Sequence, residues 1–199
     1  MLAPSANRLQ PLPTRPVRQG LLSAATSRRA PSWAQERRIS VGTVYKTFAT
    51  KAGVLKALFD VSVAGDDDPI PMAQREIIQK VLDAPEATRK IAIYAEHLAS
   101  TMPRSAPVQL LARDGAASSA DAAAVWKQIR DETLTAMKMF AADLGKTGQL
   151  RVSAAVARDV LWTYHAPELY ELLVQERGWS AARYGEFITA ALTDALLRR

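Results

Sequence analysis

Apolar residues recur at steps of three and four along most of this chain, and this periodicity constrains the fold more than any other feature. Side chains three and four apart lie on one face of an α-helix. No segment alternates apolar and polar residues in the manner of a β-strand. The sequence therefore predicts an all-α fold. The clearest stripe, within residues 121–143, consists of Trp126, Ile129, Thr133, Met137 and Phe140.

Proline, glycine and capping residues divide the chain into further helices. Thr50 is a suitable N-cap for a helix over 51–64, and the run that begins at Gly65 should end it. Pro167 should kink or divide a later helix, because proline lacks an N–H donor and its ring clashes with the preceding turn. After residue 64 we predict helices over 72–83, 86–102, 106–114, 121–143, 153–176 and 180–198.

The positive charge is confined to the N-terminal end. The chain has 199 residues and a formal net charge of +6. Residues 1–38 hold seven arginines and one acid, whereas residues 39–199 hold 19 basic and 19 acidic residues. A basic end on a neutral body is typical of a protein that binds DNA, and it also fits a solvated arm. Four prolines and little periodicity predict that residues 1–19 are a disordered basic arm.

The composition excludes several classes. The chain has no cysteine, so disulfides and thiolate metal sites are excluded. No apolar run approaches the roughly 20 residues of a membrane helix, and the N-terminal arginines have no apolar segment beside them as a secretory signal would. We therefore expect a cytoplasmic protein without a membrane partner.

The most specific motif runs from Ser40 to Lys51 and reads Ser-Val-Gly-Thr-Val-Tyr-Lys-Thr-Phe-Ala-Thr-Lys. Ser40 would cap a helix over 41–48. Its outer face carries small and polar residues, which can enter a DNA major groove about 12 Å wide. Gly42 lets the backbone come close, and Lys46 can reach guanine acceptors or a phosphate.

This motif resembles the recognition helix and following helix of the TetR family of transcriptional repressors. Residues 159–180 resemble the C-terminal regulatory domain of one TetR subgroup, so the resemblance covers about residues 39–197. It implies a small N-terminal helix-turn-helix head joined to a larger helical domain for ligand binding and dimerisation. It also assigns Tyr45 and Lys51 to the phosphate backbone of double-stranded operator DNA. The candidate DNA-binding residues are Ser40, Val41, Gly42, Thr43, Tyr45, Lys46, Thr47 and Lys51.

The segment before Ile39 departs from the family pattern. Arg37 and Arg38 stand where the family prefers a small residue and the turn glycine, and the preceding segment is about ten residues short. We expect the DNA-binding domain, residues 20–64, to have atypical first helices and to bind DNA weakly. The alternative is a TetR-like ligand-binding dimer whose DNA binding is impaired or lost.

The larger domain, residues 65–199, should bind the effector and form the homodimer. Its large apolar side chains suit an adaptable pocket, so the expected effector is a small apolar or amphipathic molecule. The candidate ligand-binding residues are Tyr94, His97, Met102, Trp126, Met137 and Trp162. The apolar stripe of the last helix predicts the dimer interface, which comprises Tyr184, Phe187, Ile188, Ala191, Leu192 and Ala195.

Motifs for catalysis or metal binding are absent from the sequence. His97 and His165, the two histidines, lack metal-ligand spacing, and we expect His165 to be structural. The run Asp66–Asp68 reads as a solvated loop. No nucleophile and base can be assembled from local motifs. We therefore expect no enzyme, metal or cofactor, but a repressor that a small molecule releases from its operator.

Overall fold

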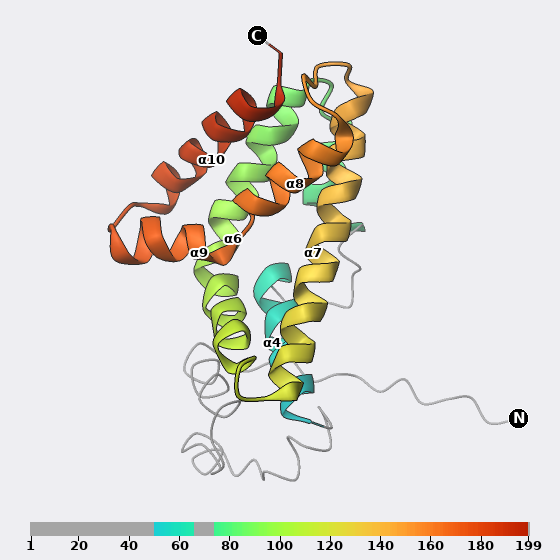
Figure 1. Cartoon of the computed structure of the whole chain (residues 1–199). Helices are drawn as coiled ribbons and strands as arrows, with labels where there is room; N and C mark the ends of the chain where they lie inside the picture. The colour runs from blue at the N-terminus through green and yellow to red at the C-terminus, as the bar shows by residue number, and fades with distance from the viewer. Residues whose placement is uncertain (1–49, 66–73, 199) are drawn as a thin grey trace, which may run out of the picture.

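The computed structural model describes residues 50–65 and 74–198, and their regular structure is helical. Figure 1 shows the arrangement. The helices are α4 (Lys51–Ala64), α5 (Glu76–Asp83), α6 (Ala87–Gly115), α7 (Ala120–Lys146), α8 (Ala154–Tyr164), α9 (Pro167–Tyr170) and α10 (Ala181–Leu196). A π-helical turn, η2 (Glu171–Glu176), continues α9, and a β-bridge joins Leu150 to Leu197. The all-α prediction is confirmed for the described residues.

Both ends of α4 lie where the sequence places them. The side chain of Thr50 accepts a hydrogen bond from the backbone N–H of Gly53 at 3.0 Å. Gly65 follows the helix with a φ of 87°, and its N–H donates to the carbonyl of Val61. Glycine is favoured there because other residues rarely adopt this left-handed conformation.

Helix α6 is longer than predicted. We expected two helices, over 86–102 and 106–114, but one helix runs through Pro103 and Pro107. Met102 and Ala106 have no exposed surface, so the residues between the prolines are anchored in the core. Burial of this face outweighs the two lost N–H donors, because packing supplies most helix stability in proteins.

The predicted helix over 153–176 is divided at Pro167, as expected. Helix α8 ends at Tyr164, and α9 begins at Pro167 itself. Proline suits the first position of a helix, where the N–H would have no partner within the helix. The division turns the chain so that α8 contacts α7 while α9 contacts α6.

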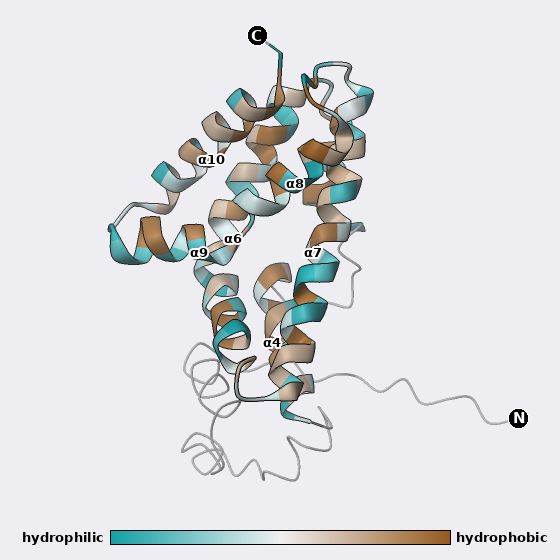
Figure 2. Cartoon of the chain, in the orientation of Figure 1, coloured by the Kyte–Doolittle hydropathy of each residue, from teal (hydrophilic) through white to brown (hydrophobic). Residues whose placement is uncertain are grey.

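Helices α6 and α7 run the length of the molecule. Figure 1 shows α4 between their lower ends and α10 along the upper part of α6, in agreement with the contacts between these helices. Figure 2 shows that hydrophilic and apolar residues alternate along α7, as an amphipathic helix requires. No helix within residues 50–65 and 74–198 is both long and apolar enough to cross a membrane.

The buried apolar side chains form two clusters along α6 and α7. The upper cluster is large and joins α5, α8 and α10 to the N-terminal part of α6, as far as Ala106, and to α7 from Met137 onward. The lower cluster begins on α6 at Val108 and extends on α7 to Ile129. Its six buried members are Leu55, Phe59, Val108, Ala112, Val125 and Ile129. The border between the clusters therefore crosses α6 at Pro107.

A buried ion pair holds α5 in the upper cluster. The Nζ of Lys90 lies 2.6 Å from Oδ2 of Asp143 on α7. It also donates to the carbonyl oxygens of Val81 and Leu82 at 2.7 and 2.9 Å. These carbonyls lie in the last turn of α5, where a helix has no N–H donors of its own to offer them. Lys90 thus satisfies one helix end while joining three helices.

Candidate functional site

A cavity of about 220 Å³ lies between α6, α7 and α8, at the border of the two apolar clusters. Gln109 contributes from α6, while Ile129 and Thr133 contribute from α7. Trp126 and Arg130 on α7 also line it, and the rest of the lining consists of Trp162, Thr163, His165, Ala166, Pro167 and Glu168. Because Ile129 is also a member of the lower cluster, the cavity touches the side chains that hold α4 in place.

Two tryptophans and an arginine form one wall of this cavity. The guanidinium carbon of Arg130 lies 5.4 Å from the centre of the Trp126 ring and 4.3 Å from that of Trp162. Trp126 and Arg130 are four residues apart on α7, so they share a face, and Trp162 approaches from α8. Both distances fall in the cation–π range. No carboxylate in the described ranges forms an ion pair with Arg130.

Glu168, the other charged residue of the lining, already has a cationic partner. Oε1 of Glu168 accepts a hydrogen bond from Nη1 of Arg113 at 3.1 Å. The same nitrogen lies 3.7 Å from a carboxylate oxygen of Glu171. Since Glu168 has a cationic partner and Arg130 has no anionic one in the described part of the chain, the uncompensated charge at the cavity is positive.

Gln109 brings an unpaired amide to the same cavity. The residue is 3% exposed, and its amide nitrogen has no hydrogen-bond partner among the described residues. A buried amide without a partner is unfavourable, and rotation of the group could offer either the N–H donors or the carbonyl oxygen to a bound molecule.

His165 adds a neutral imidazole. Its Nδ1 lies 2.9 Å from the hydroxyl of Tyr94. Burial lowers the pKa of His165 to about 4, with a smaller contribution from His97, so the ring is uncharged at neutral pH. Burial also raises the pKa of Tyr94, so its hydroxyl keeps the proton and can donate it to Nδ1. The Tyr94 hydroxyl also lies 3.5 Å from Sδ of Met137 and can donate there instead, so the tautomer of His165 decides whether Nε2 is a donor or an acceptor.

The six predicted ligand-binding residues do not lie together. Trp126 and Trp162 line the cavity. Met102 and Met137 are buried in the upper cluster, Tyr94 lies behind His165, and His97 is half-buried on α6 outside the lining. Burial, with a smaller effect of Arg104, lowers the pKa of His97.

The sequence analysis assigned none of the six polar residues of this cavity to ligand binding, namely Gln109, Arg130, Thr133, Thr163, His165 and Glu168. One signal was available: the spacing of Trp126 and Arg130 predicts a shared helix face. Nothing in the sequence indicated that α8 would cover that face.

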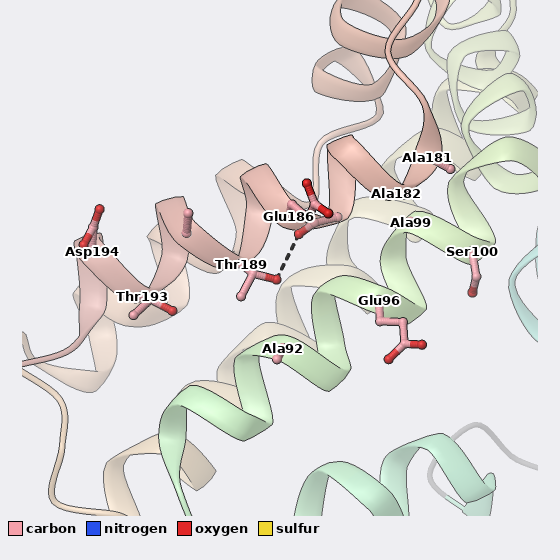
Figure 3. A pocket seen from close by; sticks show the side chains of 12 residues that line it. Ala92, Glu96, Ala99, Ser100, Ala181, Ala182, Glu186, Thr189, Thr193 and Asp194 are labelled. Atoms are coloured by element: carbon pink, nitrogen blue, oxygen red, sulfur yellow. Dashed lines mark hydrogen bonds between the residues drawn. The ribbon is translucent and has the colours of Figure 1, made fainter.

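A second, open groove of about 760 Å³ is lined by residues of α6 and α10. Figure 3 shows lining residues of this groove, with Ala92, Glu96 and Ser100 on α6 and Glu186 and Thr189 on the neighbouring α10. Most side chains of this groove are small.

The helices on either side of the groove approach each other closely. At Gly185, an added Cβ would lie 3.2 Å from the Cβ of Ala99. The glycine therefore permits the contact between α10 and α6.

The predicted dimer stripe lies largely inside the protomer. Tyr184, Ile188 and Leu192 have no exposed surface in the single chain and belong to the upper cluster. These three apolar side chains thus pack against other helices of the same chain. In this fold they cannot contact a second copy. The other members, Phe187, Ala191 and Ala195, are partly buried.

Most predicted DNA contacts fall outside the described residues. This applies to Ser40, Val41, Gly42, Thr43, Tyr45, Lys46 and Thr47, and likewise to the basic arm, the first helices of the head and the Asp66–Asp68 run. Lys51 is described and is the first residue of α4.

Polar contacts fix α4 to the long helices. Lys56 lies 3.1 Å from a carboxylate oxygen of Glu132 on α7. From α6, Nε of Arg104 donates to the carbonyl of Ser62 at 3.2 Å. A movement of the lower parts of α6 and α7 would therefore carry α4 with it.

Comparisons with protein-family models, curated proteins and solved structures found no match to this chain. Within the described ranges, no three histidine, aspartate or glutamate residues gather as metal ligands would.

Proposed function

We propose that this protein is a ligand-responsive transcriptional regulator of the TetR type, a cytoplasmic repressor that leaves its operator DNA when a small molecule binds. One observation carries the proposal. The cavity lies at the border of the two clusters, and the lower cluster holds α4, which directly follows the recognition motif over 40–48.

Ile129 provides the coupling between ligand and head. It lines the cavity and packs in the same cluster as Leu55 and Phe59 of α4. A ligand that favours one position of α7 over another shifts the population of the corresponding α4 positions. The ion pair between Lys56 and Glu132 ties α4 to α7, so a shift of α7 changes the position of α4, and we propose that the motif preceding α4 in the sequence then loses its fit to the DNA.

We infer that the functional form is a homodimer, because two heads can then contact successive major grooves about 34 Å apart. The exposed face beside the groove between α6 and α10 is our candidate surface for the second copy. Ala182 and Ala190 are exposed there, and such small side chains let helices approach closely. Tyr184, Ile188 and Leu192 are buried in the protomer's own core and are not part of this candidate surface.

A gel-shift titration with the DNA that flanks the coding region tests the proposal. Lys51→Ala should weaken binding to all sequences alike and reduce the log–log salt slope by about one. Lys46→Ala should change the preference among operators instead. Lys138→Ala, at an exposed position of α7, is the control and should leave binding unchanged. Equal losses at specific and random DNA for both variants would contradict the assigned roles.

A second function is favoured by the arginines at 37 and 38, which depart from the family pattern. In that case the chain is a ligand-binding dimer without DNA binding. It would bind small molecules and dimerise normally, yet fail to shift any of the flanking DNA at low salt.

A further inference from the structure

We propose that the cavity between α6, α7 and α8 binds a small planar aromatic carboxylate. Arg130 and Gln109 hold the carboxylate, and the ring lies against the parts of the Trp126 and Trp162 indoles that the guanidinium of Arg130 leaves uncovered. This ligand class rests on the proposed function, in which the cavity is the effector site, and it narrows the apolar or amphipathic effector expected from the sequence to an amphipathic anion.

The positive charge of Arg130 at the cavity favours an anionic ligand. Arg130 lacks an anionic partner among the described residues, whereas Glu168 is bonded to Arg113. A guanidinium presents N–H donors in one plane and binds a carboxylate through two parallel hydrogen bonds. Arg130 can make these bonds at its edge while its face stays on Trp162.

The same geometry disfavours a cation. Two indole faces could in principle hold an ammonium group, as aromatic cages do. Here the guanidinium of Arg130 already occupies that place, 4.3 Å from the Trp162 ring centre. A cationic guest would have to displace it and would add a like charge beside it.

The uncharged polar groups also favour a ligand rich in acceptors. The amide of Gln109 is buried without a partner in the described part of the chain, so a carboxylate oxygen can accept from its N–H. His165 is neutral, and in the tautomer that accepts from Tyr94 at Nδ1 it carries an N–H at Nε2. Together with the guanidinium, these groups supply donors from α6, α7 and the end of α8.

The size of the cavity limits the ligand further. Sites for drug-sized ligands measure about 300–1,000 Å³. This cavity, at about 220 Å³, is smaller and fits a molecule with one ring. Because Trp126 and Trp162 supply flat apolar surfaces, the ring should be aromatic.

Calorimetric titration of the full chain with three probes of equal shape tests the proposal. Benzoate is the anion, benzamide its neutral analogue and benzylamine the cation. We expect benzoate to bind at least about tenfold tighter than benzamide, since hydrogen bonds to a charged group are stronger. Benzylamine should give no measurable binding. Equal affinities for benzoate and benzamide, or tighter binding of benzylamine, would overturn the proposal.

Two variants locate the binding site. Arg130→Gln should weaken benzoate about tenfold and leave benzamide unchanged. Arg183→Gln is the matched control, because Arg183 lies 4.0 Å over the Trp179 ring in the same kind of stack, away from the cavity. Unchanged benzoate affinity in Arg130→Gln, or an equal loss in Arg183→Gln, would refute the assignment.

These titrations contain no DNA, so they separate the two proposals. Benzoate discrimination without operator binding supports the ligand class and contradicts the proposed repressor. Operator binding without benzoate discrimination contradicts the ligand class alone.

Discussion

Lys90→Met would leave the carboxylate of Asp143 buried without its closest cation. Asp143 is 8% exposed and would lose a contact of 2.6 Å. Val81 and Leu82 would lose the donor to their carbonyls. Lys146 remains 3.3 Å from Asp143, but its side chain is 76% exposed and can compensate only in part.

The expected cost follows from these contacts. Removal of one partner from a buried ion pair costs about 3–5 kcal/mol. The remaining contact with Lys146, and the methionine chain that replaces the lysine stem, place the expected loss near the lower bound, at about 3 kcal/mol. This is a large fraction of a total stability of about 5–15 kcal/mol.

Urea denaturation followed by circular dichroism measures the loss. Lys146→Met is the matched control and should cost less than about 1 kcal/mol, because exposed ion pairs contribute little. The double variant Lys90→Met with Asp143→Leu should be more stable than Lys90→Met alone, since no charge is then left unpaired in the core. If the double variant is instead as unstable as the sum of the single changes, uncompensated charge does not explain the effect.

Two further predictions concern His165 and α10. The pKa of His165 is about 4 in the folded protein and about 6.5 in an ordinary histidine, so the unfolded state binds more protons between these two pH values. The free energy of unfolding should therefore fall, by up to about 3 kcal/mol, as the pH is lowered from 6.5 to 4. His165→Gln should flatten that part of the stability–pH profile in urea titrations, and an unchanged profile would contradict the assignment. Leu192→Arg should unfold the chain, because Leu192 has no exposed surface, whereas Ala190→Arg, at an exposed position, should leave the fold intact and weaken the dimer in sedimentation. A folded Leu192→Arg monomer, or an unaffected Ala190→Arg dimer, would show that these roles are wrong.

Local sequence signals predicted the parts of the fold that depend on neighbouring residues. Thr50 and Gly65 bound α4, and Pro167 begins α9, because caps and prolines act within one helical turn. Pro103 and Pro107 misled the prediction, since packing from distant helices keeps α6 continuous.

The candidate site was predicted less completely. Periodicity identified the buried face of α10 but not what covers it, and the cover is the same chain's core rather than a second copy. Trp126 and Trp162 were recognised as large apolar residues. Gln109 and Arg130 gain their significance only when α8 covers α6 and α7, a long-range arrangement that a single sequence does not indicate.

The border between the two apolar clusters has a consequence for how the molecule melts. At this border α6 lacks the N–H donor of Pro107, so a break in the backbone hydrogen bonds coincides with the break in side-chain packing. The upper and lower clusters, with the helices that they hold, are therefore two blocks of unequal size that heat or denaturant can unfold separately. The lower block, with six buried residues, can lose its order while the upper block stays intact. Among the described residues, the apolar contacts that hold α4 belong to this small block, so the release of α4 from them should need less free energy than unfolding of the whole described region.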